Sequence, residues 1–286
     1  MITKQSVIGI VGLGVLGGSY AQALRSAGYE SIIGFDIDSE ALQYALEKGW
    51  IQEGTGDPER ASECDLLIFC LYPGVFVKWI REHRNCLKQG VLITDVTGVK
   101  RAVLNQIEEE LPENAEFIAC HPMAGRESKG IRFADAGRFQ NANFIIVPTD
   151  KNTPEAIETM RQLAQDMGFR RIACLSAEEH DRMISFLSQL THVIAVSLMN
   201  ANDNTNLAEY TGDSFRDLTR IARINEDMWP ELFVLNKDFL IQDIDDFIRE
   251  MESFREMIQN EDTDGMKQKM ILSTERRKMF DGEGTK

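Results

Sequence analysis

Basic residues are scarce in this chain of 286 residues, which has 31 lysines and arginines against 46 aspartates and glutamates. The net charge of −15 argues against nucleic acid as a partner, because binding to phosphates needs a basic surface. An anionic substrate would therefore need a local cluster of arginine, lysine and histidine side chains. Long apolar runs are missing too. None approaches the roughly 18–20 residues of a membrane span, so we expect no membrane partner.

Cysteine is also sparse. The chain has five cysteines, an odd number, and no CxxC pair. This usage predicts free thiols in a reducing compartment, so we expect a cytoplasmic protein. His83 and Cys86 have a spacing that would suit a metal, but no second pair of ligands accompanies them in the sequence. We therefore expect no metal site.

Residues 1–175 alternate short β-branched runs with helical patterns. Such alternation predicts an α/β fold with a largely parallel, doubly wound Rossmann-type sheet. The runs LLIFCL and VLIT are apolar throughout, as expected for interior strands covered on both faces. The expected strands are residues 7–11, 31–36, 65–71, 91–95, 116–119, 143–147 and 170–174.

The pattern changes to helices after Cys174. Ser176 and Glu179 are spaced as a capping box, which predicts the start of a long helix that runs to about residue 202. A polar loop follows, over residues 202–213. Trp229-Pro230 then predicts the start of another helix, because proline suits the first helical position.

Apolar residues of this later helix repeat in steps of four and three, from Leu240 to Ile258. The heptad-like stripe suits packing against another helix, either within the chain or from a second chain. Gly265 is expected to separate it from a last helix. We therefore expect two domains, a Rossmann-type domain of residues 1–175 and an all-helical domain of residues 176–286 that binds substrate and forms a homodimer.

A GxGxxG motif runs from Gly12 to Gly17. Alone, this motif is weak evidence for nucleotide binding. Here it follows a predicted strand and begins a predicted helix, which is the context that dinucleotide binding requires. Gly12 permits the tight turn, Gly14 lets the backbone approach a pyrophosphate, and Gly17 lets helix and strand pack closely. Leu16 is expected at the cofactor with them, in a first helical turn whose N–H groups favour phosphate.

Asp36 ends the second predicted strand. A carboxylate at this place accepts hydrogen bonds from the adenosine ribose and repels a 2′-phosphate. No arginine follows directly, so NAD is favoured over NADP. A simple strand–helix turn would explain the glycines, but it would not explain Asp36, and we expect the first domain to bind NAD.

Two segments follow strands at the edge of the sheet where ligands bind, residues 94–100 and 120–130. His121 stands in the second, near the expected place of the nicotinamide. Oxidation of an alcohol needs a group that takes the hydroxyl proton as hydride leaves, and a neutral imidazole suits that task. From the residues alone, a structural histidine at the strand end is an equal alternative.

Taken together, these motifs resemble the prephenate/arogenate dehydrogenase family of tyrosine biosynthesis. The matching segments come in family order between about residues 7 and 229. They read GLGVLGGS, DVTGVK, HPMAGRESKG, FLSQLTHVIAVSL and FRDLTRIARINEDMW. HPMAG followed by the TH and DLTRIA segments is far more specific than GxGxxG. The resemblance implies an NAD-dependent oxidoreductase that converts prephenate to 4-hydroxyphenylpyruvate by oxidative decarboxylation.

The resemblance also implies the catalytic residues. His121 matches the histidine that engages the ring 4-hydroxyl of the substrate and assists its deprotonation. The family commonly has a serine where this chain has Gly98, and that serine lies between nicotinamide and substrate. Thr97, its neighbour, is the candidate for a substitute hydroxyl.

Substrate-binding residues follow from the same comparison. His192 matches a histidine that helps to hold the substrate side chain, and Arg220 matches the arginine that binds a substrate carboxylate. Glu127 and Trp229 match positions that line the pocket, and Arg216 aligns with a basic residue near its entrance. Arginine suits anion binding because its guanidinium can donate two parallel hydrogen bonds.

Three other functions stay open at this point. An arogenate dehydrogenase, which gives tyrosine directly, differs only in the ammonium group of its substrate, and Glu127 could pair with that group. A β-hydroxyacid dehydrogenase shares the layout but typically has a Lys-x-x-Asn pair, which this chain lacks. A non-catalytic NAD-binding sensor would not need the histidines and arginines outside the glycine motif.

Overall fold

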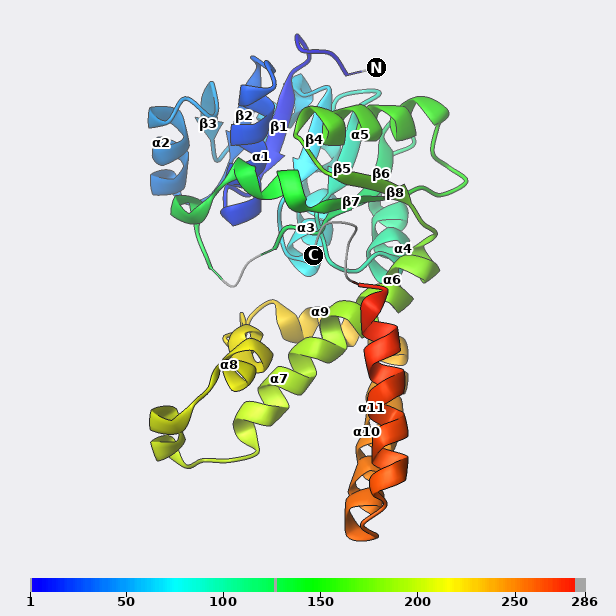
Figure 1. Ribbon diagram of the computed structural model, residues 1–286. Helices are drawn as coiled ribbons and strands as arrows, with labels where there is room; N and C mark the ends of the chain where they lie inside the picture. Colours follow the sequence, from blue (N-terminus) through cyan, green and yellow to red (C-terminus); the bar gives the residue numbers. More distant parts are fainter. Residues whose placement is uncertain (1, 126–127, 281–286) are drawn as a thin grey trace. The chain divides into compact units, whose positions relative to one another are not determined.

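The computed structural model describes residues 2–125 and 128–280. It divides into two compact units, Met1–Lys237 and Asp238–Lys286. The first unit contains a sheet and helices α1 to α9, and the second contains nearly all of α10 and the whole of α11 (Figure 1).

The sheet has eight strands in the order β3-β2-β1-β4-β5-β6-β7-β8. Neighbouring strands pair in parallel except β6 and β7, which are antiparallel. The predicted α/β fold with a largely parallel, doubly wound sheet is therefore confirmed. The strands are β1 Ile8–Val11, β2 Ile32–Phe35, β3 Glu53–Thr55, β4 Leu66–Phe69, β5 Leu92–Asp95, β6 Glu116–Pro122, β7 Asn143–Val147 and β8 Arg171–Cys174.

The inner strand β4 is apolar at every position because both faces of the sheet are covered. Side chains alternate between the faces, so Leu66 and Ile68 of β4 pack with α1 and α5, whereas Leu67 and Phe69 pack with α3 and α4. All four of these side chains are at most 1% exposed. The helices that cover the sheet are α1 Val15–Ser26, α2 Ser39–Glu47, α3 Pro73–His83, α4 Arg101–Glu110 and α5 Pro154–Asp166.

Two strands differ from the prediction. The short edge strand β3 was not predicted, because its three residues Glu-Gly-Thr carry no apolar pattern. Strand β6 continues to Pro122, beyond the expected end at residue 119, so His121 lies within the strand and pairs with Ile145 of β7. The antiparallel pairing with β7 extends the strand in this way.

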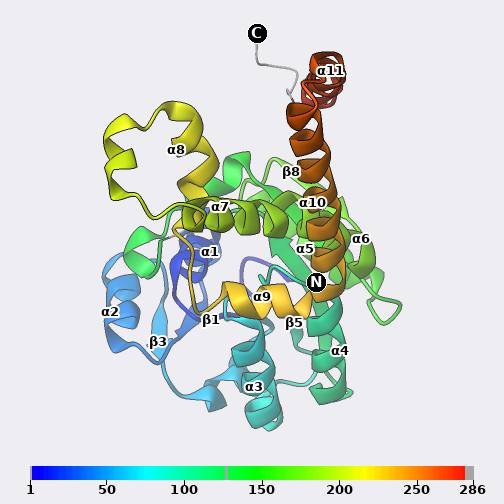
Figure 2. The same ribbon diagram turned by 90° about the horizontal axis from the view of Figure 1, so that it is seen from below.

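After the sheet, the first unit continues with helices α6 to α9, which lie beyond one end of the strands (Figure 1) and of which α7 and α9 stand in front of the sheet when it is seen from below (Figure 2). The predicted capping box is present, since Ser176 accepts from the Glu179 amide and the Glu179 side chain accepts from the Ser176 amide. The predicted long helix is interrupted by a π-helical turn, Ser185–Leu190. The elements are α6 Ala177–Ile184, α7 Thr191–Asn200, α8 Asp213–Thr219 and α9 Trp229–Leu235.

One stretch, Ala177–Asn200, is long and apolar enough to cross a bilayer by length and composition alone, with a mean hydropathy of 1.3. Ile184, Ser188 and His192 from this stretch line a cavity inside the first unit. These contacts give its side chains a role within the folded protein.

The second unit is a pair of helices, α10 Lys237–Gln259 and α11 Thr263–Lys278, joined by an ion pair between Glu250 and Lys269. Gly265 does not separate them, contrary to expectation. It lies in the first turn of α11, where its N–H donates to the Asp262 carboxylate. The chain turns just before, at Glu261, which has a φ of 54°.

Candidate active site

A cavity of about 560 Å³ lies in the first unit at the carboxyl ends of β5 and β6. The loop after β5 contributes Gly98, and the end of β6 contributes His121. The rest of the wall comes from the first turn of α1, the residues just after β6, the end of α6, the π-helical turn, α7, α9 and the segment before α9.

Five of the predicted site residues meet at this cavity, namely Leu16, His121, His192, Arg220 and Trp229. An imidazole from the sheet and a guanidinium from the helices thus open onto one space. Leu16 belongs to the glycine motif, so the same space reaches the expected nucleotide site. The cavity therefore brings together three groups that the sequence predicted separately: a general base, an anion-binding side chain and the glycine-rich turn expected to bind the cofactor.

Two of the residues predicted for catalysis or substrate binding are not on the wall of this cavity. Arg216 is on α8, where its side chain is 65% exposed and pairs with Asp213 at 3.4 Å. Thr97 is buried. A third, Glu127, lies outside the described residues.

The Thr97 hydroxyl takes part in a buried polar cluster. It donates to the Asp95 carboxylate, lies 3.0 Å from the Val99 carbonyl oxygen and accepts from the Lys100 ammonium at 3.2 Å. Asp95 and Lys100 form an ion pair of 2.6 Å with both side chains fully buried. The structure therefore gives Thr97 other partners than the substrate, and it is Gly98 that lines the cavity.

The glycine motif has the shape that a dinucleotide requires. Gly12 has a φ of +91°, and a Cβ at this position would stand 2.8 Å from the Cys70 carbonyl oxygen. A Cβ on Gly17 would stand 1.9 Å from the Gly12 carbonyl oxygen, whereas Gly14 has nothing within 4 Å of such an atom. The open space at Gly14, directly before α1, is where a pyrophosphate would approach the helix N-terminus.

Asp36 is fixed beside this turn. Its carboxylate accepts from the Leu13 amide at 2.6 Å and from the Asp38 amide at 2.9 Å. Each carboxylate oxygen can accept more than one hydrogen bond, so the residue can still accept from ribose hydroxyls. The turn and this carboxylate fit an adenine dinucleotide without a 2′-phosphate.

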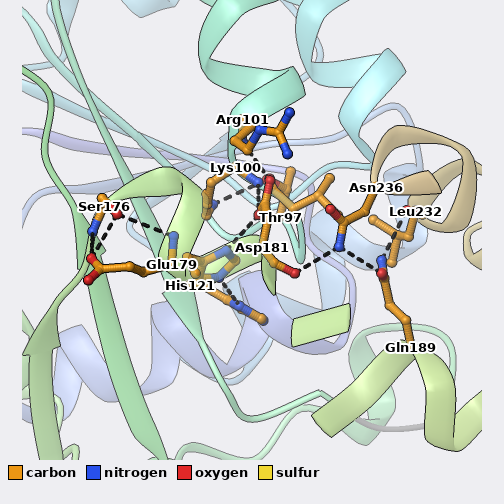
Figure 3. Close-up of polar contacts among 12 residues, drawn as sticks. Thr97, Lys100, Arg101, His121, Ser176, Glu179, Asp181, Gln189, Leu232 and Asn236 are labelled. Atoms are coloured by element: carbon orange, nitrogen blue, oxygen red, sulfur yellow. Dashed lines mark hydrogen bonds and ion pairs between the residues drawn. The ribbon is translucent and has the colours of Figure 1, made fainter. Parts of the chain in front are cut away.

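His121 is hydrogen-bonded to residues that were not predicted from the sequence. Its Nδ1 lies 2.8 Å from Nε2 of His180, and Nδ1 of His180 lies 2.8 Å from the Asp181 carboxylate. Asp181 in turn accepts from the backbone amides of Lys100 and Arg101, both at 2.8 Å (Figure 3). His180 and Asp181 are fully buried.

These surroundings lower the pKa of His121 well below its usual range. Burial is the largest cause, followed by the charges of His180 and Lys100. Burial also lowers the pKa of His180, against the opposing effect of its hydrogen bond to Asp181. Both imidazoles are therefore neutral near neutral pH, and a neutral imidazole is the form that can accept a proton.

His192 and Trp229 form one side of the cavity wall. Their rings are stacked at a tilt of 31°, with centroids 3.8 Å apart. Nδ1 of His192 donates to the Ser188 carbonyl oxygen at 2.8 Å, and the Thr191 hydroxyl donates to the same oxygen at 2.6 Å. A carbonyl oxygen only accepts, so Nδ1 is the protonated nitrogen of His192.

A second buried set of hydrogen bonds ties this wall to α6. The Asn236 amide nitrogen donates to the Asp181 carbonyl oxygen at 2.9 Å and to Gln189 at 2.8 Å. Gln189 donates to the Leu232 carbonyl oxygen at 3.0 Å. Neither Gln189 nor Asn236 was predicted, because each acts through contacts between elements far apart in the sequence.

Comparison with known proteins gives a consistent result. The model for the prephenate dehydrogenase nucleotide-binding domain matches residues 20–173, and the model for the prephenate dehydrogenase dimerization domain matches residues 176–272. A cyclohexadienyl dehydrogenase of Zymomonas mobilis is 31% identical over 90% of each chain. A prephenate dehydrogenase of Bacillus subtilis is 29% identical over 93% of this chain and 74% of its own.

Solved structures agree. The prephenate dehydrogenase from Aquifex aeolicus, in complex with hydroxyphenyl propionate and NAD⁺, superposes with a TM-score of 0.89 at 26% identity, covering 98% of this chain and 99% of that one. A 3-hydroxyisobutyrate dehydrogenase from Salmonella typhimurium reaches only 0.56 at 16% identity, over 88% of each chain, and so shares the fold alone. Since the two family models together match most of the sequence, the chain belongs to the prephenate dehydrogenase family.

Proposed function

We propose that this protein catalyses the NAD-dependent oxidative decarboxylation of prephenate to 4-hydroxyphenylpyruvate. The observation that carries the proposal is the meeting of His121 and Arg220 on one cavity that also reaches Leu16 of the glycine motif. Prephenate is a cyclohexadienol with two carboxylates, so its oxidation needs a base, a cation and a nicotinamide in one place.

The residues divide this work. His121 is neutral and takes the proton of the 4-hydroxyl. Bound NAD⁺ supplies the acceptor for the hydride from C4. The ketone that forms is vinylogous to the ring carboxylate, so CO₂ leaves and the ring becomes aromatic. The protein has mainly to orient the ring and hold its charges.

The negatively charged substrate is held by a positively charged side chain. Arg220 binds a carboxylate through its guanidinium, while the stacked rings of His192 and Trp229 provide a flat surface for the substrate. A positive group at the cavity offsets the net charge of −15, which would otherwise disfavour a dianion.

Prephenate is proposed over arogenate. Arogenate carries an ammonium group and would favour a carboxylate in the cavity wall, but no Asp or Glu is among the described residues that line it. Glu127, the candidate for such a role, lies outside the described residues. Its proposed place at the substrate pocket is therefore tested by comparing the two substrates.

We also propose that the protein is a cytoplasmic homodimer with a Rossmann-type domain of residues 1–175 and a helical domain of residues 176–286. The match to a dimerization domain supports the homodimer, and so does the exposed apolar stripe of α10, where Met251 and Ile258 are 58% and 60% exposed. Light scattering measures the oligomeric state directly.

The decisive experiment measures NADH formation from prephenate and from arogenate, side by side, with the wild type and a His121→Asn variant. We expect prephenate to give the higher kcat/KM and the variant to lose roughly 10²–10⁴-fold in kcat. His83→Asn is the matched control, because His83 contacts Trp79 edge-on and does not line the cavity. Full activity of His121→Asn, or no NADH from either substrate, would overturn the proposal.

A further inference from the structure

The hydrogen bonds behind His121 form a directed chain that starts at the N-terminus of a helix. The two carboxylate oxygens of Asp181 accept hydrogen bonds from the backbone amides of Lys100 and Arg101, at the start of α4. Free N–H groups and the helix dipole stabilise negative charge at such a place. Both oxygens of the Asp181 carboxylate therefore act as acceptors.

Because Asp181 accepts, it determines which ring nitrogen of His180 carries the proton. The 2.8 Å contact between its Nδ1 and Asp181 requires that Nδ1 carry the hydrogen. Because His180 is neutral, its Nε2 then has a lone pair and no proton. His180 thus presents an acceptor to whatever it meets on its other side.

His180 meets Nδ1 of His121, at 2.8 Å. An acceptor on His180 requires a donor on His121, so Nδ1 of His121 carries the hydrogen. Its Nε2 is then unprotonated, and the ring lines the cavity. This is the tautomer that can take a proton from a substrate hydroxyl.

We propose that His180, oriented by Asp181, is a positioning residue that fixes His121 in the tautomer with a proton on Nδ1 and a lone pair on Nε2. The inference deepens the proposed function, since it rests on His121 as the base. It adds a residue pair that does not touch the substrate and acts only through His121.

The proton balance of the step is simple. The O–H bond of the substrate breaks and an N–H bond forms at Nε2 of His121, which becomes an imidazolium. Its Nδ1–H still donates to His180, and the new positive charge lies at the end of a chain that terminates in the Asp181 carboxylate. The charges that face the histidine pair are Lys100 and Asp95 from the β5 side and Asp181 from α6.

The first test reads the tautomer itself. ¹⁵N NMR of the histidine-labelled, full-length protein distinguishes protonated from unprotonated ring nitrogens. The chain has four histidines, so single His→Asn variants assign each signal. We expect Nδ1 of His121 to be protonated and Nε2 to be unprotonated at neutral pH. The opposite tautomer in the wild type overturns the proposal without any further variant.

Two variants test the cause. His180→Phe removes the acceptor while keeping a flat ring, and Asp181→Ala removes the carboxylate that holds the proton on Nδ1 of His180. In both, we expect the Nε2-protonated tautomer of His121 to appear and kcat to fall roughly 10–10²-fold, the range found for the hydrogen-bond partners of metal-binding histidines. KM for prephenate should change little, because neither side chain lines the cavity.

Asn236→Ala is the matched structural control. Asn236 is buried in the same region but bonds the Asp181 carbonyl oxygen, not the carboxylate. It should lower thermal stability without changing the tautomer. If His180→Phe keeps both the tautomer and kcat, or if Asn236→Ala inverts the tautomer equally, the proposal is wrong. Failure of the proposed function is distinguishable, since it leaves the predicted tautomer without NADH formation.

Discussion

Gly17 approaches Gly12 so closely that a side-chain carbon on Gly17 would stand 1.9 Å from the Gly12 carbonyl oxygen. The first turn of α1 is thereby packed directly on the turn that precedes it. Gly14, two residues after Gly12, faces open space instead. The glycines of one motif therefore have separable physical roles, one in the fold and one toward a ligand.

Alanine at these two positions should separate those roles. Gly17→Ala forces the helix from the turn, and we expect a loss of about 1–3 kcal/mol in the free energy of unfolding. Gly14→Ala should cost no more than about 1 kcal/mol, since only a helix-capping position changes. It should nevertheless weaken NAD binding at least about tenfold, or 1.4 kcal/mol.

Chemical denaturation and calorimetric titration with NAD measure the two effects. Equal losses of stability in both variants would contradict the assignment of Gly17 to packing. Unchanged NAD affinity in Gly14→Ala would contradict the approach of the pyrophosphate to this turn.

Replacement of Arg220 by lysine keeps the charge but removes the two-pronged donor. We expect KM for prephenate to rise about 10–100-fold, because a hydrogen bond to a charged group contributes about 1.5–3 kcal/mol. Arg216→Lys serves as the control, since Arg216 is exposed and pairs with Asp213. Initial rates over a range of prephenate concentrations decide between them, and a larger effect at Arg216 would reverse the two roles.

Thr97→Val should act on stability. The buried Asp95 carboxylate would lose one donor, at a cost of about 1–3 kcal/mol in unfolding free energy, while kcat of the folded enzyme changes little. Thr97→Ser keeps the hydroxyl and should restore stability. A large fall in kcat at unchanged stability would instead return Thr97 to the reacting atoms.

Activity should hold at mildly acidic pH. His121 must be neutral to act as a base, and its pKa is lowered from the usual 6.5 by burial and by its neighbours His180 and Lys100. As pH falls, kcat/KM should therefore decline only below about pH 6.5. A profile of kcat/KM against pH locates the midpoint of this decline. A midpoint above the usual histidine value would contradict the lowered pKa.

The sheet could be predicted from sequence because its strands are apolar and short, and glycine turns separate them from helices. Strand β3 was not predicted, because Glu53–Thr55 has no apolar pattern and the strand is defined only by its pairing with β2. His121 and Arg220 were predicted to share a site, although they are 99 positions apart in the sequence, because the family motifs identified both.

The support of His121 could not be predicted in the same way. His180 and Asp181 follow a capping box and were read only as the start of a helix, and their contact with the loop after β5 exists only in the folded chain. Thr97 did carry a local signal. Its amide donates to the carboxylate of Asp95 two residues earlier, a turn that aspartate favours and that directs the hydroxyl inward.

The π-helical turn at Ser185–Leu190 has one further consequence, for changes in chain length. A π turn accommodates one residue more than an α turn, and each residue of an α-helix advances the chain by about 100°. Deleting a single residue here would remove the extra residue and let the helix become regular, while the residues after it, His192 included, keep about their present register. A one-residue deletion in a regular turn of α6 would instead rotate the following residues by about 100°. The π turn is therefore the place in this helix where a shorter backbone should be tolerated best.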